Sequence, residues 1–306
     1  MILKKGSKGE AVKELQKFLG VVADGIFGAH TEALVIEFQK KNGLASDGIV
    51  GPQTWNLMGI ATTDASETNT DQPTITPYRK DLVSFNNGFQ YYTYHLPKGE
   101  YKNGPIKPKW VFLHHTAGWH NPFNTITNWG KDTRGAIATE WVLGGPSVKG
   151  NDTVHDGILV QAFPEGNWGY HLGKNGSQTM HVNSVGIEVC NFGYVVNGKT
   201  YAGATVDPSQ IVKLAKPFRG HTEWHAYSDK QIEVLKQWLL FIAERDNIDI
   251  RQGLPALIKQ KGADAFEYND AVYYGKLEGV WTHTNTRKDK VDMFPQQELM
   301  DMLTSL

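Results

Sequence analysis

Three side chains that can bind a metal or stabilise charge lie close together near the C-terminal end of the sequence. Residues 282–296 read THTNTRKDKVDMFPQ and contain His283, Lys290 and Asp292. Imidazole and carboxylate groups are ligands of divalent transition metals, and an ammonium group stabilises a developing negative charge. A polar run of this kind is also typical of a solvated loop, so residues elsewhere in the chain must decide between the two interpretations.

Another candidate ligand, His114, follows a predicted buried strand. The run WVFL at residues 110–113 is continuously apolar, and His114 comes directly after it. A side chain at a strand end is held rigidly and projects into the crevice where α/β sheets place their sites. His283 also follows a short apolar pair. Together with Asp292, the two histidines are three ligands suited to Zn²⁺, and they leave the fourth tetrahedral position open, as in catalytic zinc sites.

Two other histidines compete for a place in this metal site. His221 and His225 lie four residues apart on either side of Glu223. Residues spaced by four are close neighbours on one face of a helix, and Ser228 predicts that the next helix begins after them. We therefore interpret both histidines, at most, as residues that support the ligands or contact a substrate.

His115 and Cys190 are predicted to be buried and unreactive. Side chains alternate between the two faces of a strand, so His115 points away from the face that His114 takes. A core or hydrogen-bonding role follows for His115. Cys190 is the single cysteine of the chain and lies two residues after Glu188. A free cysteine most often behaves as a small buried apolar residue, so we do not expect it to be a nucleophile.

The composition is that of an ordinary globular protein and excludes two classes of partner. The chain has 306 residues, a formal net charge of -1 and a charged fraction of 21%. Without a long basic block there is no electrostatic basis for nucleic-acid binding. No apolar run reaches the length of a membrane span, and the start MILKKGSKGE lacks the apolar region of a signal peptide. We expect cytoplasmic synthesis, no membrane association and no obligate protein partner.

A polar, threonine-rich segment divides the chain into two predicted domains. Residues 61–77 read ATTDASETNTDQPTITP and contain almost no large apolar side chains. Such a segment cannot bury enough surface to offset its ordering entropy and is predicted to be a flexible linker. A small domain of residues 1–60 and a large domain of residues 78–306 follow from this boundary.

The small domain contains an internal repeat. VADGIFGAHT at residues 22–31 and ASDGIVGPQT at 45–54 share the pattern DGxxGxxT. Apolar residues at helical spacing lie before and between the two copies and predict three short helices, with Phe38 and Trp55 in the core. Over nearly all of residues 1–59, the run LKKGSKGEAVKELQKFLG, the two turns and the final Trp55 resemble the peptidoglycan-binding domain family of bacterial and phage cell-wall enzymes. The resemblance implies the peptidoglycan mesh as ligand.

The large domain is predicted to be α/β, with a central mixed β-sheet flanked by helices. Buried strands are expected at residues 110–113, 140–143 and 185–189, and residues 157–163 are expected in a hairpin. The clearest helix covers residues 229–245, because Ser228 and Gln231 form a capping box before one apolar stripe. Strands separated by helices favour this layered arrangement, preceded by the small three-helix all-α domain.

Four motifs of the large domain occur in an order that resembles a known enzyme family. They are FLHHTAG at 112–118, WGYHLG at 168–173, NSVGIEV at 183–189, and His283 with a KxD triplet that ends at Asp292. In this order they resemble the zinc-dependent N-acetylmuramoyl-L-alanine amidases, relatives of the peptidoglycan recognition proteins. The resemblance covers about residues 105–305, except for residues 246–279, which match no motif and are interpreted as an insertion.

The resemblance implies a role for each motif residue. His114, His283 and Asp292 correspond to the zinc ligands, and Asp292 takes a position that many relatives give to cysteine. Glu188 corresponds to the acid that activates water in some members, and Lys290 to a lysine that faces the oxyanion. His171 is implied in the substrate groove, with a structural role as the alternative. Some relatives carry a catalytic tyrosine where this chain has residues 138–140, ATE, so Glu188 must act without it.

The implied function is hydrolysis of the amide bond between N-acetylmuramic acid and L-alanine, in a phage or prophage endolysin that a holin releases to the bacterial cell wall. Two alternatives belong to other classes. One is a peptidoglycan-binding protein that keeps the amidase fold without catalysis. The other is a zinc peptidase that cuts within the stem peptide. The candidate set of His114, His283, Asp292, Glu188 and Lys290 favours the amidase.

Overall fold

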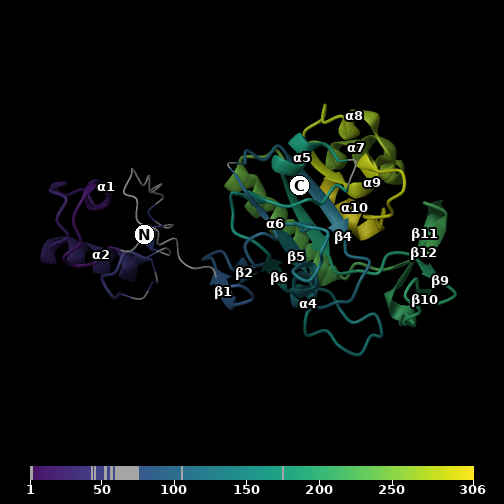
Figure 1. The fold of residues 1–306 in the computed structure, drawn as a ribbon, viewed down its shortest axis with the longest axis horizontal. Helices are drawn as coiled ribbons and strands as arrows, with labels where there is room; N and C mark the ends of the chain where they lie inside the picture. Colours follow the sequence, from purple (N-terminus) through teal and green to yellow (C-terminus); the bar gives the residue numbers. More distant parts are fainter. Residues whose placement is uncertain are drawn as a thin grey trace. The chain divides into compact units, whose positions relative to one another are not determined.

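The chain forms two compact units, residues 1–72 and 73–306, in the computed structural model (Figure 1). The structure describes residues 3–42, 44, 46–51, 54, 55, 58, 76–104, 106–173 and 176–306. Most of the linker predicted at residues 61–77 lies outside these ranges. Among the described helices, none combines the length and the apolar character that crossing a membrane requires.

The first unit consists of helices joined by turns over its described residues. Helix α1 covers Glu10–Phe18 and α2 covers Ala29–Lys41. Thr54, Trp55 and Met58 are also helical, while the other residues of the predicted third helix lie outside the described ranges. Trp55 is buried as predicted, and Phe38 packs against the core, which comprises Leu3, Val12, Leu15, Phe27, Val35, Val50, Trp55 and Met58.

A buried glutamine holds the turn in the first copy of the repeat. The side-chain amide of Gln16, in α1, donates to Asp24 Oδ1 at 2.7 Å and to the Ile26 carbonyl at 3.1 Å. Its oxygen accepts from the Gly25 backbone N–H at 2.8 Å. Gly25 has φ of 74°, a conformation that glycine adopts without steric cost. One side chain therefore satisfies three polar groups of the Asp-Gly turn.

The second copy repeats this arrangement from α2. Gln39 donates to Asp47 Oδ1 at 2.9 Å and to the Ile49 carbonyl at 2.8 Å, and it accepts from the Gly48 N–H at 2.9 Å. Each glutamine also contacts the threonine that closes its own copy, 15 residues further along the chain. The repeated structural unit is thus larger than the pattern DGxxGxxT and also includes the helix that precedes each turn.

Replacing Gln16 with Ala should destabilise the first unit by about 1–3 kcal/mol, because the buried Gly25 N–H would lose its acceptor. Hydrogen exchange of the full chain, followed by mass spectrometry, would show faster exchange in peptides of residues 3–42, with the second unit as internal reference. The matched control is Lys17→Ala in the same helix, which removes only an exposed ion pair with Glu14. Equal effects of the two substitutions would contradict the role assigned to Gln16.

The second unit is built on a seven-stranded mixed sheet, as predicted. The strand order is β1-β2-β6-β5-β8-β4-β13. The four strands β5, β8, β4 and β13 are adjacent and parallel to one another. Strand β6 pairs antiparallel with β5, and β1 pairs antiparallel with β2. The strands are β1 Lys80–Ser84, β2 Gln90–Tyr94, β4 Trp110–His115, β5 Trp141–Leu143, β6 Leu159–Gln161, β8 Ser184–Val189 and β13 Gly279–Thr282.

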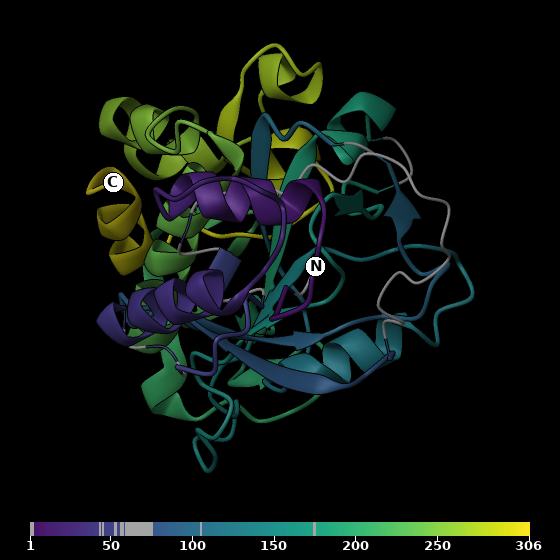
Figure 2. The ribbon, with the colours of Figure 1, turned by 90° about the vertical axis from the view of Figure 1, so that its left-hand side faces the viewer.

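Helices cover both faces of this sheet. Alternate residues of β5 divide between two cores, with Trp141 and Leu143 in the larger core and Val142 in the smaller one beside α4. Helices α6 and α7 contribute to the larger core, and α10 packs against these two helices (Figure 2). The helices are α4 Pro122–Trp129, α5 Gln178–Val182, α6 Asp229–Asp246, α7 Leu254–Lys261, α8 Asp270–Tyr273, α9 His283–Thr286 and α10 Gln297–Thr304.

Shorter elements complete the unit. Strand β11 pairs with β12 in a two-stranded ribbon, and further short strand pairs join β3 with β7 and β9 with β10. Two 3₁₀ turns, η1 and η2, precede β11 and α8. Their bounds are β3 Lys102–Asn103, β7 Asn167–Trp168, β9 Val195–Val196, β10 Lys199–Thr200, η1 Pro208–Gln210, β11 Ile211–Phe218, β12 His221–His225 and η2 Gly262–Phe266.

The predicted capping box at the start of α6 is confirmed. Ser228 Oγ accepts from the Gln231 N–H at 3.0 Å, and Gln231 Oε1 accepts from the Ser228 N–H at 3.1 Å. The predicted apolar stripe faces the core, where Leu239 and Ile242 are fully buried. At the other end, Asn247 closes the helix in the left-handed conformation.

Residues 246–279, in which the sequence showed no motif, pack into the larger core. They supply η2, α7 and α8, and the side chains of Leu254 and Phe266 are fully buried. Their backbone also meets the outer edge of β13, where the Val280 N–H donates to the Gln252 carbonyl at 3.2 Å. A side chain at Gly253 would overlap the Val280 backbone, so glycine permits this close approach.

Candidate active site

The candidate site residues lie at the carboxyl ends of three parallel strands. Strand β4 lies between β8 and β13, and the register pairs His114 with Glu188 and Leu113 with Thr282. His283 directly follows Thr282, so it emerges beside His114. Parallel strands end at the same edge of a sheet, where α/β folds hold their ligands. This register brings together residues that are up to 169 positions apart, from His114 to His283.

His114, His283 and Asp292 form one buried cluster. Asp292 Oδ2 lies 3.0 Å from His283 Nδ1 and 3.3 Å from His114 Nδ1. The candidate ligand atoms of the three residues all lie within 4.8 Å of one another. At 0%, 5% and 7% relative exposure, the three side chains are withdrawn from bulk solvent. The structure thus brings together the residues that the sequence nominated as metal ligands.

A compact turn delivers two members of the cluster from the stretch of residues 282–296. The Thr284 N–H donates to the Asp292 carbonyl at 3.0 Å, which closes the loop between α9 and Asp292. A capping box between Thr282 and Asn285 fixes the first residue of α9, His283. Folding back in this way explains why the imidazole and the carboxylate lie nine residues apart in the sequence and adjacent in space.

The segment 246–279 supports this turn from outside. Asn285 is fully buried, and its side-chain amide donates to the carbonyls of Ala265 and Glu267, both at 2.9 Å. The Asn269 N–H in turn donates to the Asn285 carbonyl at 3.0 Å. The segment that resembles no motif therefore helps to position His283.

Burial and neighbouring charges set the protonation of the cluster. Burial lowers the pKa of His114 to about 4, although Asp292 opposes this shift. Burial alone would raise the pKa of Asp292, but the adjacent His283 and His114 bring it well below its ordinary value. At neutral pH, His114 is therefore neutral and Asp292 is ionised. These are the forms in which imidazole and carboxylate bind a metal.

A cavity of about 970 Å³ opens beside the cluster, and Glu188 and Lys290 line it. Glu188 Oε2 is buried and has no hydrogen-bond partner among the described residues. Burial, followed by the charge of Asp292, raises the pKa of Glu188 well above its ordinary value, while Lys290 opposes the shift. A carboxyl group with a raised pKa can both accept and return a proton near neutral pH.

His171 lines the same cavity and also contacts the cluster. Its Nδ1 lies 3.0 Å from His114 Nε2, and its Nε2 lies 2.8 Å from Ser184 Oγ. Burial, followed by the charge of His114, lowers the pKa of His171 well below its ordinary value, so its ring is neutral. The contact from the far side of His114 fixes the orientation of that imidazole, as is usual for groups behind a metal ligand.

The remaining histidines named in the sequence do not join the cluster. His115 is buried and hydrogen-bonded to the Tyr227 hydroxyl at 2.8 Å, which confirms the predicted hydrogen-bonding role. His221 and His225 lie on strand β12, not on a helix. His221 stacks on Tyr194 with 3.8 Å between ring centroids, and His225 Nε2 lies 3.0 Å from Gln210 Oε1. Both are occupied with packing and hydrogen bonds of the ribbon region.

Cys190 is a buried thiol, as predicted. Its side chain is 1% exposed, and burial raises its pKa to about 12. Because the thiolate is the nucleophilic form, this residue is unreactive at neutral pH.

Residues 138–140, where some relatives carry a tyrosine, offer no replacement for it. Thr139 lines the cavity, but its hydroxyl donates to the Trp141 carbonyl at 2.7 Å. Glu140 is buried and accepts two hydrogen bonds from Arg245, at 2.6 and 3.0 Å. Residues 138–140 therefore place no tyrosine hydroxyl in the cavity.

The cavity wall includes residues that the sequence did not single out. The ring centroid of His181 lies 5.7 Å from that of His171 and 5.2 Å from that of Tyr170, and all three residues line the cavity. Arg134 also lines the cavity and carries a positive charge. Tyr170 is part of the WGYHLG motif and could have been found there, whereas His181 and Arg134 are brought in by the tertiary fold alone.

Two family profiles match the chain. The profile described as N-acetylmuramoyl-L-alanine amidase matches residues 104–290, which is more than half of the chain. A profile described as a peptidoglycan binding domain matches residues 8–58. No curated protein is similar enough to the chain to count as a match.

Several solved structures are similar to parts of the chain. A peptidoglycan-binding protein from Clostridioides difficile is 42% identical over 19% of this chain and 40% of its own, with a TM-score of 0.19. A Burkholderia AP3 phage endolysin is 35% identical over 21% of this chain and 27% of its own, with a TM-score of 0.19. The catalytic domain of XlyA is 12% identical over 70% of this chain and 95% of its own, with a TM-score of 0.38. The chain thus spans less than half the length of the first two structures.

Proposed function

Because the chain belongs to the N-acetylmuramoyl-L-alanine amidase family, we propose that it hydrolyses peptidoglycan at the amide bond between N-acetylmuramic acid and L-alanine. We further propose that it does so with Zn²⁺ held by His114, His283 and Asp292. The single observation that carries the proposal is the buried cluster of these three residues at the edge of a cavity that also contains Glu188 and Lys290.

The donor set fits Zn²⁺ better than Mg²⁺ or Ca²⁺. Two imidazoles and one carboxylate are ligands typical of catalytic zinc sites, whereas the harder cations prefer oxygen ligands alone. The neutral state of His114 and the ionised state of Asp292 fit the same group. When bound, Zn²⁺ supplies Lewis acidity, which polarises an amide carbonyl and makes a water molecule more acidic.

Glu188 is proposed to move the protons of the reaction. Its register position next to His114 places it at the ligand cluster, and its partnerless Oε2 leaves an oxygen free to accept a proton from the attacking water. As the water oxygen bonds to the carbonyl carbon and the carbon–nitrogen bond breaks, the same carboxyl would return the proton to the departing alanine nitrogen.

Lys290 is proposed to stabilise the negative charge that develops on the carbonyl oxygen. It lines the cavity two residues before Asp292 and supplies a positive charge there. Groups that act in this way in other enzymes contribute about 3 kcal/mol to transition-state stabilisation. His171 would support the reaction by holding the ring of His114.

The two matched regions suggest a division of labour along the chain. We assign residues 1–60 to binding of the bacterial cell wall and residues 78–306 to catalysis, with residues 61–77 as the linker. This is the combination of an endolysin, which acts on peptidoglycan in the cell wall. The wall-binding unit would hold the catalytic unit near its polymeric substrate and raise the local concentration of cleavable bonds.

Digestion of purified peptidoglycan sacculi tests the reaction. The expected products are stem peptides with a new free N-terminal alanine, without an increase in reducing sugar ends. A reaction with an added zinc chelator serves as the blank. Other new N-termini would identify a peptidase instead, and the absence of any soluble product would identify a binding protein.

A further inference from the structure

A second group of metal-binding side chains lies on two loops of the large unit. His120, Asp152 and His155 each place a ligand atom within 4.8 Å of the other two. His120 lies between β4 and α4, whereas Asp152 and His155 belong to the connection between β5 and β6. None of the three lines the cavity that contains Glu188. The sequence did not reveal this group, because its members come from separate loops.

The spacing of this group fits a shared ion. His120 Nε2 lies 3.3 Å from Asp152 Oδ2. This is beyond the usual range of about 2.7–3.2 Å for an N–H···O hydrogen bond. Two ligands at about 2.0–2.1 Å from a tetrahedral Zn²⁺ are roughly 3.3–3.4 Å apart. His114 Nδ1 and Asp292 Oδ2, in the first cluster, show the same separation of 3.3 Å.

Backbone contacts hold the two loops in place. The Gly145 N–H donates to the His120 carbonyl at 3.1 Å, which joins one loop to the other. Gly144 passes so close to the His155 carbonyl that any side chain there would overlap it. Asp152 Oδ1 accepts from the Val154 N–H at 2.8 Å, so Oδ2 is the oxygen left to face His120. The three ligands are therefore positioned before any ion binds.

The hydrogen bonding of the group favours a cation. Nδ1 of His155 is buried without a hydrogen-bond partner among the described residues. Two imidazoles and one carboxylate again form a donor set suited to Zn²⁺.

We propose that His120, Asp152 and His155 form a second Zn²⁺ site, which joins the connection between β5 and β6 to the start of α4. Three protein ligands leave one position for water, and the bound ion would link the two loops that supply them. The site does not depend on the proposed catalytic function, because none of its ligands belongs to the first cluster.

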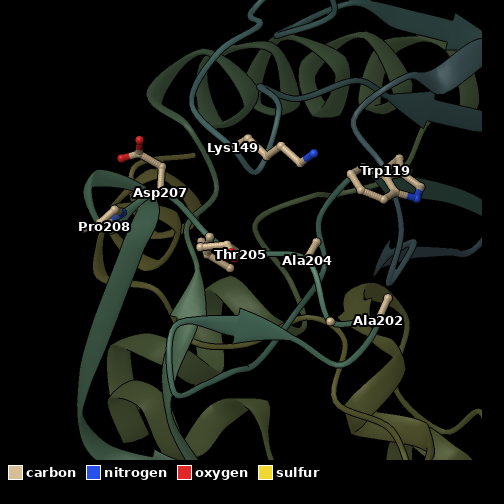
Figure 3. A pocket seen from close by; sticks show the side chains of 9 residues that line it. Trp119, Lys149, Ala202, Ala204, Thr205, Asp207 and Pro208 are labelled. Carbon is tan, nitrogen blue, oxygen red and sulfur yellow. The ribbon is translucent and has the colours of Figure 1, made fainter.

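The proposed ion would also fix part of a second cleft. Trp119 directly precedes His120, and Lys149 lies three residues before Asp152. Both line a cleft of about 600 Å³ together with residues 202–208. Figure 3 shows the side chains of Trp119, Lys149 and Asp207 around this cleft. Metal binding by His120 and Asp152 would therefore restrict the backbone near Trp119 and Lys149 in the wall of this cleft.

The metal content of the full chain tests this proposal. After equilibration with Zn²⁺ and removal of free metal, the Asp152→Asn variant should contain one equivalent less than the unsubstituted chain by elemental mass spectrometry. Asn can still accept from the Val154 N–H, so the loop is retained while the charged ligand is lost. His30→Ala, an exposed histidine of the first unit, is the control and should not change the content. Equal content in Asp152→Asn and the unsubstituted chain would overturn the proposal.

A spectroscopic measurement covers the case in which Asp152→Asn unfolds. In the His283→Ala variant the first cluster is disabled, so Co²⁺ should produce visible absorption that saturates at one equivalent through the second group. Adding His155→Gln to His283→Ala should abolish that absorption. A His283→Ala variant that shows no such absorption, or one that keeps it after His155→Gln, would overturn the assignment.

Discussion

Replacing Glu188 with Gln is expected to lower peptidoglycan hydrolysis by about 10²–10⁴-fold and to leave the zinc content unchanged. The amide has nearly the same shape as the carboxyl group but cannot accept the proton of water. Glu188 is not one of the three residues of the ligand cluster, so metal binding should survive. Release of soluble fragments from labelled sacculi measures the rate, and elemental mass spectrometry measures the metal.

Glu223→Gln is the matched control for this substitution. Glu223 lies on β12, outside the residues that line the cavity, and forms only a long surface ion pair of 3.9 Å with Lys213. Its replacement should leave the rate within about twofold, because exposed ion pairs contribute little. If Glu188→Gln hydrolysed sacculi as fast as the unsubstituted chain, another group would have to carry the proton.

Replacing His283 with Ala should remove both the metal of the first cluster and the activity. The substitution deletes one of the three candidate ligands and leaves Asp292 with His114 as its single imidazole neighbour, at 3.3 Å. Loss of a partner behind a metal ligand already weakens binding by about 10–100-fold, so loss of a ligand itself should do more. Zinc content is expected to fall by one equivalent, and hydrolysis to fall to the level of a chelated sample.

The control for His283→Ala is His221→Ala. His221 stacks on Tyr194 and is not part of either group of candidate ligands, so metal content and rate should persist. Removal of zinc from the unsubstituted chain with a chelator, followed by its return, should abolish and then restore hydrolysis. A His283→Ala variant that kept its zinc and its rate would exclude this residue from the metal site.

Elements with strong local patterns could be predicted from the sequence. Helix α6 begins at the expected capping box of Ser228 and Gln231 and presents the expected apolar stripe. Strands β4, β5 and β8 overlap the buried strands that were expected at residues 110–113, 140–143 and 185–189. In both cases the information lies within a few consecutive residues, where turn chemistry and side-chain periodicity act directly.

The sequence predicted which residues belong to the candidate site, but it did not predict the contacts among them. His114, His283 and Asp292 were nominated by strand ends and by a family resemblance, and the structure places them together. The contact between His171 and His114 depends on how the segment between β7 and α5 folds over the end of β4, which no local pattern reports. Contacts between segments that are distant in the sequence can be predicted only when the register of the sheet strands is known.

The same limit explains two features that the sequence did not reveal. Gln16 and Gln39 lie outside the repeated pattern DGxxGxxT, although they hold both of its turns. A buried glutamine on an amphipathic helix resembles any polar residue until its partners are known. His120 and His155 meet where the Gly145 N–H donates to the His120 carbonyl and Gly144 packs against Pro122 and the His155 carbonyl.

The backbone of residues 252 and 253 lies along β13 and affects how accessible this outer strand is to other copies of the chain. β13 and β1 are the two outermost strands of the sheet, and an open outermost strand can pair with a strand of another molecule and lead to aggregation. The contact of Gln252 with Val280 occupies one such strand, while Lys80 and Asp81 place charges on the other. Residues 246–279 thereby cover part of one outer strand that would otherwise be open to such pairing.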